Sequence, residues 1–92
     1  MQDGEPTFSA YIEGPDKIRL DRSAEFNLTG TEEINEPVSY SIDNDKLVQI
    51  VKVEENKCVL KANNKNILGN FVLTATYKDA TYTKNISIIP LW

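Results

Sequence analysis

Short runs in which apolar and polar residues alternate recur along this chain, and a turn signal follows almost every run. The clearest run covers residues 23–29, where Ala24, Phe26 and Leu28 alternate with polar residues before Gly30 ends the pattern. A period of two places successive side chains on opposite faces of a strand, so each run has one apolar and one polar face. The repeated pattern predicts an all-β fold in which two sheets bury their apolar faces against each other.

About seven antiparallel strands in two sheets are expected, which is the pattern of a small immunoglobulin-like β-sandwich. Gly14-Pro15-Asp16 interrupts the first strand, as happens where an edge strand changes sheet. Residues 47–53 also fit a helical period, but their β-branched side chains favour a strand. The predicted strands are residues 8–13 continued by 17–20, then 23–29, 38–42, 47–53, 57–62, 71–78 and 81–89.

The alternation also predicts which side chains form the core. Tyr40, in the third main run, is the aromatic expected to anchor the interior. Ile67 and Leu68, in the long connection of residues 63–70, are expected to plug one end of it. The residues predicted to anchor the core are Phe26, Tyr40, Leu60, Phe71 and Leu73.

The length of 92 residues corresponds to one domain, expected at residues 8–92 after a flexible tail of residues 1–7. Cys58 is the only cysteine, so no intramolecular disulfide forms, and it is expected to be a buried small apolar residue. The net charge of −4, with scattered basic residues, argues against nucleic acid as a partner. No apolar stretch approaches the roughly 20 residues of a membrane span.

The residues that would carry catalysis or hold a metal are mostly missing. There is no histidine, no Gly-x-Ser-x-Gly motif and no phosphate-binding glycine loop, so neither an enzyme nor a cofactor is expected. Glu32, Glu33 and Glu36 occupy one loop, and Asp43 and Asp45 the next turn. Because successive strands reverse direction, these two acidic segments are expected at opposite ends of the sandwich. A shared calcium site is therefore not predicted.

Three aromatic residues are the candidate ligand contacts. Tyr77 and Tyr82 flank the last predicted hairpin, and Trp92 ends the sequence. If they are exposed, these rings, together with that of Tyr11, could form a platform on which a sugar stacks. The alternative is that the two tyrosines pack within the core and the hairpin.

Three segments resemble bacterial and bacteriophage immunoglobulin-like domains of the BIG_2 type. Residues 18–20 with 24–28 resemble the opening pair of strands of that family, and residues 38–45 resemble its V-x-W-S-x-x-x-D strand and turn. Lys61-Ala62, then Gly69 before residues 71–75, resembles its K-A…G…I-T-A segment. Tyr40 stands where the family usually has tryptophan, and residues 21–23 replace its usual glycine. These departures indicate a divergent, phage-type member.

The resemblance implies a non-enzymatic module, because no catalytic residues are known for this family. Such domains decorate phage heads, tails and fibres or occur in bacterial surface adhesins. The expected function is that of an accessory module of a phage structural protein, on the virion surface, that attaches weakly to host cell-surface carbohydrate through many copies. One alternative is a spacer in a bacterial surface protein, holding apart the rest of its own polypeptide. Another is an assembly domain that pairs through an edge strand.

Overall fold

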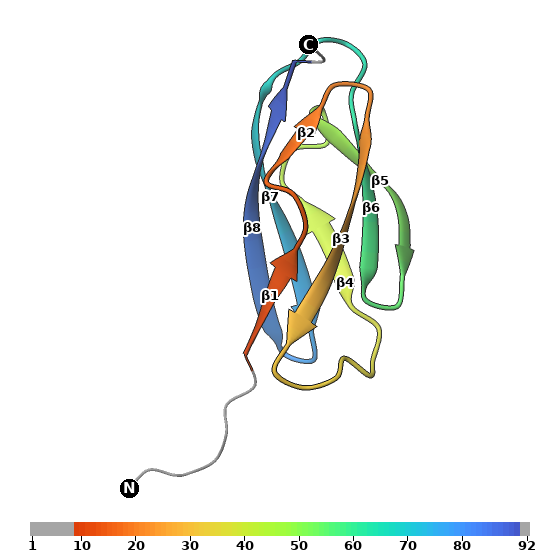
Figure 1. Cartoon of the computed structure of the whole chain (residues 1–92), viewed down its shortest axis with the longest axis vertical. Coiled ribbons are helices and arrows are strands. Elements are labelled where there is room, and N and C mark those ends of the chain that lie inside the picture. The colour runs from red at the N-terminus through yellow and green to blue at the C-terminus, as the bar shows by residue number, and fades with distance from the viewer. Residues whose placement is uncertain (1–8, 91–92) are drawn as a thin grey trace, which may run out of the picture.

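A computed structural model describes residues 9–90, which form two four-stranded sheets packed face to face as a β-sandwich (Figure 1). The predicted tail of residues 1–7 and the candidate Trp92 lie outside the described residues. Over residues 9–90 the chain has no helix. The strands are β1 (Ala10–Glu13), β2 (Lys17–Arg19), β3 (Ser23–Gly30), β4 (Ser39–Ile42), β5 (Val48–Glu54), β6 (Lys57–Ala62), β7 (Gly69–Tyr77) and β8 (Ala80–Ile89).

The strand order confirms the predicted immunoglobulin-like sandwich. One sheet has the order β1-β3-β6-β5 and the other has the order β2-β8-β7-β4. Apart from the divided first strand, this is the strand order of a constant-type immunoglobulin domain. The eight strands therefore correspond to the seven predicted, with the first split in two as expected.

One pair of strands departs from the expected antiparallel arrangement. β2 lies parallel to β8, with Ile18 opposite Ile88, whereas the other paired strands are antiparallel. The reason is that the chain changes sheet between β1 and β2 without reversing its direction. β2 therefore runs the same way as β8 when it joins that strand's free edge.

Gly14 makes this change of sheet possible. Its φ is 155°, and a Cβ there would overlap the ring of Phe26 and lie 2.9 Å from the carbonyl oxygen of Glu25. Only a residue without a side chain lets the backbone pass so closely over β3. The link between the two sheets thus depends on this glycine.

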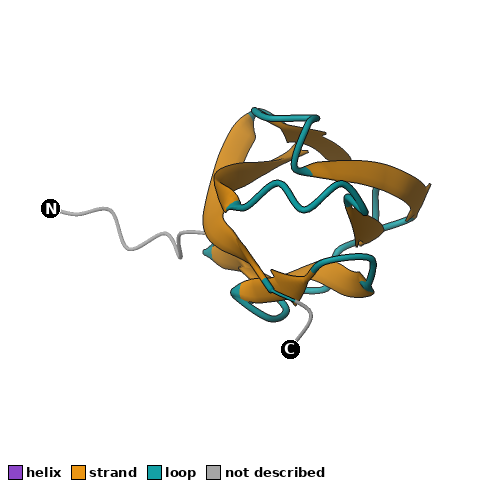
Figure 2. Ribbon diagram, turned by 90° about the horizontal axis from the view of Figure 1, so that it is seen from above, coloured by secondary structure: helices purple, strands orange, loops and turns teal. Residues whose placement is uncertain are grey.

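The core lies between the two sheets, which face each other in the view along the long axis (Figure 2). The predicted inward faces of β3, β6, β7 and β8 are confirmed, since their alternating apolar residues are the buried ones. Four of the five predicted anchors are buried, with at most 1% of the surface of each exposed. These four residues are Phe26, Leu60, Phe71 and Leu73.

The prediction that Tyr40 is the central anchor was wrong. Tyr40 faces inward from β4 but is only half-buried, because β4 is the last strand of its sheet. Its hydroxyl donates a hydrogen bond of 2.5 Å to the carbonyl oxygen of Asn56, in the turn between β5 and β6. Tyr40 therefore ties the two sheets together at one side of the sandwich. Burial raises the pKa of this hydroxyl to about 12, and the nearby Cys58 adds to the rise.

A bulge explains the ambiguous pattern of residues 47–53. Ile50 pairs with Leu60 and Lys52 pairs with Val59, so Val51 is an extra residue without a partner in the ladder. An inserted residue interrupts the ladder, so the apolar residues of this segment do not keep a strict period of two. The predicted strand is confirmed as β5, and Val51 is exposed.

The prediction that Ile67 and Leu68 plug the core was also wrong, since 39% and 50% of their surfaces are exposed. Leu47, just before β5, fills that place and is 3% exposed. A Cβ on Gly69 would lie 3.4 Å from Leu47, so Leu47 occupies the space beneath the start of β7. Leu47 thus closes the core at this end.

Candidate functional site

The loops of this sandwich gather at its two ends, because the strands run along its long axis (Figure 1). The upper end in Figure 1 holds the β2–β3 turn and the β6–β7 loop, with the β4–β5 loop nearby. The lower end holds the β3–β4 loop and the β7–β8 turn. Glu32 and Asp45 consequently line different pockets, one at each end.

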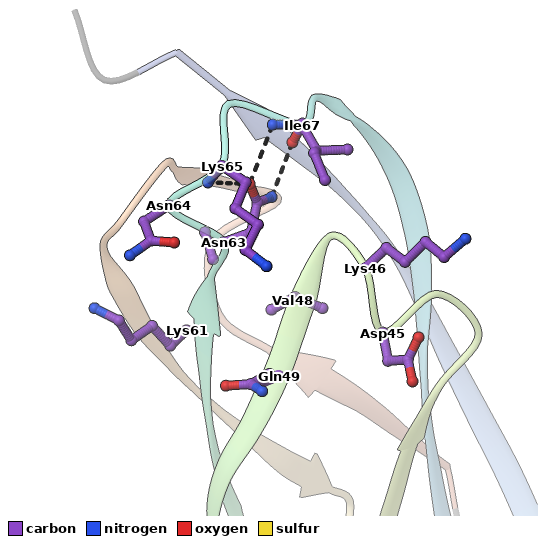
Figure 3. Close-up of a pocket in the computed structure, with 10 residues that line it drawn as sticks. Asp45, Lys46, Val48, Gln49, Lys61, Asn63, Asn64, Lys65 and Ile67 are labelled. Carbon is purple, nitrogen blue, oxygen red and sulfur yellow. Dashed lines mark hydrogen bonds between the residues drawn. The ribbon is translucent and has the colours of Figure 1, made fainter.

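A pocket of about 380 Å³ lies at the upper end, between β5, β6 and the loops that flank them (Figure 3). Three lysines line it: Lys46 from the β4–β5 loop, Lys61 from β6 and Lys65 from the β6–β7 loop. Figure 3 shows Lys46 and Lys61 on opposite sides of the pocket. The fold therefore brings Lys46 to the same pocket as Lys61 and Lys65, which follow it on a later strand and loop.

The three lysines differ in their partners. The amine of Lys61 lies 3.2 Å from a carboxylate oxygen of Asp21, and both side chains are about half exposed. Lys46 and Lys65 are both exposed, and neither takes part in an ion pair among residues 9–90. These two amines remain accessible to an anionic group from outside.

Asn63 builds the loop that carries Lys65. Its amide nitrogen donates to the carbonyl oxygens of Leu47 at 3.0 Å and Ile67 at 2.9 Å. Its amide oxygen accepts from the backbone nitrogens of Lys65 at 2.9 Å and Ile67 at 3.1 Å (Figure 3). With its hydrogen-bonding capacity used inside the loop, Asn63 is a scaffold residue rather than a ligand contact. The loop closes around this amide, and Ile67 is left exposed.

A second pocket, of about 420 Å³, lies at the lower end between the β3–β4 loop and the β7–β8 turn. Tyr77 lines it but is only 3% exposed, so its ring is not available as a stacking face. The hydroxyl of Tyr77 donates to the side-chain oxygen of Asn35 at 3.0 Å and accepts from the backbone nitrogen of Asn35 at 3.2 Å. Tyr77 therefore holds the β3–β4 loop against the end of β7.

Tyr82 is the candidate aromatic residue that keeps an accessible surface in this pocket. It is half-buried and pairs with Ala75 across β7 and β8, which places it diagonally from Tyr77 on the inward face. Of the platform candidates among residues 9–90, only Tyr82 is therefore accessible at this pocket, while Tyr11 is exposed on β1 in the other sheet. The carboxylates Glu32, Glu33 and Asp79 also line this pocket.

The described residues contain no assembled reactive group. Cys58 is fully buried, and burial raises the pKa of its thiol to about 11, so it is held as the unreactive thiol. No three carboxylate, histidine or cysteine side chains of residues 9–90 converge into a possible metal site. Every buried side-chain nitrogen or oxygen in this part of the chain has a hydrogen-bond partner. Between Ser9 and Pro90, no helix is long and apolar enough to cross a membrane.

Comparisons with protein-family models, curated proteins and solved structures found no match to this chain. The fold and its two ends are thus the basis for a functional proposal. The lysines of the upper pocket were missed by the sequence reasoning, which counted clusters along the chain. Strand direction was the signal that could have found them, because it assigns Lys46, Lys61 and Lys65 to the same end.

Proposed function

We propose that this chain is a non-enzymatic immunoglobulin-like module of a larger phage structural protein on the virion surface. In this role the module is a spacer that holds two parts of its polypeptide apart. The resemblance of residues 18–28 and 38–45 to BIG_2-type domains supports the phage context. A bacterial surface protein could use the module as a spacer in the same way.

The observation that carries this proposal is the placement of the first and last strands. At the lower end, Ser9 and Thr31 exchange hydrogen bonds, which hold the chain beside the β3–β4 loop before β1 begins. At the upper end, the backbone nitrogen of Leu20 donates to the carbonyl oxygen of Ile89 at 3.0 Å. The described chain therefore starts at one end of the sandwich and finishes at the other (Figure 1).

This placement also resists tension. A force on the two ends draws β1 and β2 one way and β8 the other, so the β1–β3 and β2–β8 ladders are loaded along the strands. Hydrogen bonds loaded in this direction share the force and must break together. The parallel β2–β8 pair is thus suited to a module that transmits load in line.

Single-molecule pulling tests the proposal with the same protein in two geometries. Handles at the two termini load the β2–β8 ladder in shear. Handles at Asn70 and the C-terminus separate β7 from β8 at their shared upper end, so those bonds break one at a time. We expect the terminal geometry to require a force several times higher, because forced unfolding follows the unfolding barrier. Equal forces in the two geometries would remove the basis for an in-line load-bearing role.

Weak attachment to host-surface carbohydrate is a second candidate function, supported by the half-buried ring of Tyr82 in the lower pocket. A half-exposed aromatic ring beside carboxylates is a suitable sugar-stacking surface. Titration of isotope-labelled protein with peptidoglycan fragments, teichoic acid and oligosaccharides tests it. Tyr82→Leu is expected to abolish the shifts, whereas the control Tyr11→Leu, at an exposed tyrosine on β1, is expected to keep them. Absence of shifts at millimolar ligand would contradict the attachment role and leave the spacer and assembly roles.

Assembly through an edge strand is the less favoured alternative. The free edge of β5 carries the bulge at Val51, and the free edge of β4 has only four residues. Bulges and short edge strands both hinder pairing with another chain. Contacts between copies are better supported at the ends of the sandwich.

A further inference from the structure

The exposed charges of this sandwich are divided between its two ends, although the whole chain is acidic. At the upper end cations outnumber carboxylates, and at the lower end carboxylates outnumber cations. The charged residues of the upper end and its flanking β4–β5 loop are the cations Arg19, Arg22, Lys46, Lys61 and Lys65 and the carboxylates Asp21, Asp43 and Asp45. Those of the lower end are the carboxylates Glu32, Glu33, Glu36, Glu55 and Asp79 and the cation Lys78.

The positive end surrounds the upper pocket. Lys46 and Lys65 are exposed there and stay outside the ion pairs of residues 9–90, while Lys61 is shared with Asp21. Arg19 extends this surface to the place where β8 finishes, since its guanidinium donates to the carbonyl oxygen of Pro90 at 2.9 Å. The last described residue of the chain therefore lies within the positive surface.

The negative end surrounds the lower pocket. Glu32, Glu33 and Asp79 are exposed at its rim, and the Tyr77–Asn35 hydrogen bonds hold the acidic loop in place. The first described residue, Ser9, is hydrogen-bonded to Thr31, next to Glu32. The described chain thus begins within the negative surface and ends within the positive one.

We propose that copies of this module dock end to end, with the lysine-rich upper end of one copy against the acidic lower end of the next. Charge complementarity identifies the partner as a second copy, because the excess charge of each end is opposite in sign to that of the other end. An interface between different patches of two identical chains is heterologous and can repeat, giving a row of modules with one polarity. Modules joined in tandem have the same head-to-tail polarity, because the C-terminal end of one module leads into the N-terminal end of the next.

The contact is expected to be weak between separate copies. The charges are exposed, and complementary surface charges raise encounter rate and specificity more than affinity. Linking modules in one polypeptide or displaying them densely on one particle gives millimolar effective concentrations, at which a weak contact is occupied. This inference extends the proposed in-line role but does not depend on its force test.

Charge reversal tests the proposal by sedimentation of the full chain over a range of concentrations. One variant reverses the upper end (Lys46→Glu with Lys65→Glu), and another reverses the lower end (Glu32→Lys with Glu33→Lys). The control reverses Lys52 and Lys57, which are exposed on the strands β5 and β6 and form surface ion pairs with Glu54 and Glu25, and it gives the same change of net charge as the upper-end variant. Unchanged unfolding midpoints show that each variant remains folded.

The wild-type chain is expected to associate in about 0.01 M salt and to become monomeric in about 1 M salt, where screening is nearly complete. Each end variant alone is expected to associate at least about tenfold more weakly, because the reversal removes the charge excess of one of its two ends. An equimolar mixture of the two end variants is expected to form pairs, since one unaltered end remains on each. The control is expected to associate like the wild type.

Three results would overturn the proposal. The first is a wild-type chain that stays monomeric at millimolar concentration in low salt. The second is end variants that associate as strongly as the Lys52/Lys57 control. The third is a mixture of the two end variants in which no pairing returns, since a head-to-tail contact requires it.

Discussion

The middle of this sandwich and its two ends differ in what their residues do. In the middle, alternate side chains from both sheets are buried, and the fold is stabilised by their packing. At the ends, exposed charged residues from separate loops meet, and little apolar surface is buried by them. Substitutions in the middle are therefore expected to change stability and leave contacts between copies alone. Substitutions at the ends are expected to do the reverse.

The largest difference is expected between two leucines. Leu73→Ala removes a fully buried side chain from β7 and is expected to cost about 2–5 kcal/mol of unfolding free energy through lost burial and a residual cavity. Leu68→Ala, at a residue that is 50% exposed in the β6–β7 loop, is expected to stay within about 0.5 kcal/mol. Urea unfolding of both variants provides the measurement. Equal losses would mean that the end loop is part of the core after all.

Two glycines allow the stability cost of an unusual backbone conformation to be compared with the cost of a steric clash. Gly14 and Gly69 both have a φ of 155°, but only Gly14 lies against backbone and a core ring. Gly69→Ala is expected to cost about 1–2 kcal/mol through strain alone. Gly14→Ala is expected to cost at least about 1 kcal/mol more, because Phe26 and β3 must move. Chemical denaturation compares the two, and a costlier Gly69→Ala would contradict the close passage over β3.

Alkaline pH is expected to weaken the middle of the molecule. Burial raises the pKa of the Cys58 thiol from 9.0 to about 11 and that of Tyr40 from 10.0 to about 12. Both groups are neutral in the fold and lose their protons at lower pH in the unfolded chain. Their contribution to stability is thus complete below about pH 9 and is lost between pH 9 and 12.

Unfolding free energies measured across this range should fall by roughly 1–2 kcal/mol for each group. Tyr40→Phe removes the tyrosine step and leaves the cysteine step, which makes it the matched control. It also removes the hydrogen bond to the Asn56 carbonyl, at a cost of about 1 kcal/mol at neutral pH. A flat pH profile in the wild type would show that neither group is shielded from water.

The smallest effect on stability is expected for the upper-end charge reversal. Lys46→Glu with Lys65→Glu touches no buried residue and no ion pair among the described residues, so unfolding should shift by less than about 0.5 kcal/mol. The same variant should show the loss of association described above. A large loss of unfolding free energy would show that these two lysines help to stabilise the fold.

The strands could be predicted from the sequence because alternation records which face of each strand is buried. Phe26, Leu60 and Leu73 followed this rule. Tyr40 also faces inward, but it is only half-buried because β4 is the last strand of its sheet, and pairing order is not encoded in a local pattern. The parallel pairing of β2 was missed for the same reason.

The ends could be predicted only in part. Strand direction correctly separated the acidic β3–β4 loop from Asp45. Strand direction was not applied to the lysines. Nothing in the sequence indicated that the side-chain amide of Asn63 would organise the β6–β7 loop. Without that loop geometry, Leu68 and its neighbour Ile67 were expected in the core. The structure of the two ends depends on contacts between residues that are distant in the sequence, whereas the burial of residues in the middle follows from local alternation.

The most direct test of contact through the ends is intermolecular paramagnetic broadening. A spin label on Asn64→Cys places the probe at the upper pocket of one copy, and the buried Cys58 does not compete for it. An isotope-labelled wild-type copy, mixed at low salt, reports which amides are broadened. End-to-end docking predicts broadening around Glu32, Asn35 and Asp79 at the lower end. Broadening of the upper end itself, or evenly over the whole surface, would contradict it.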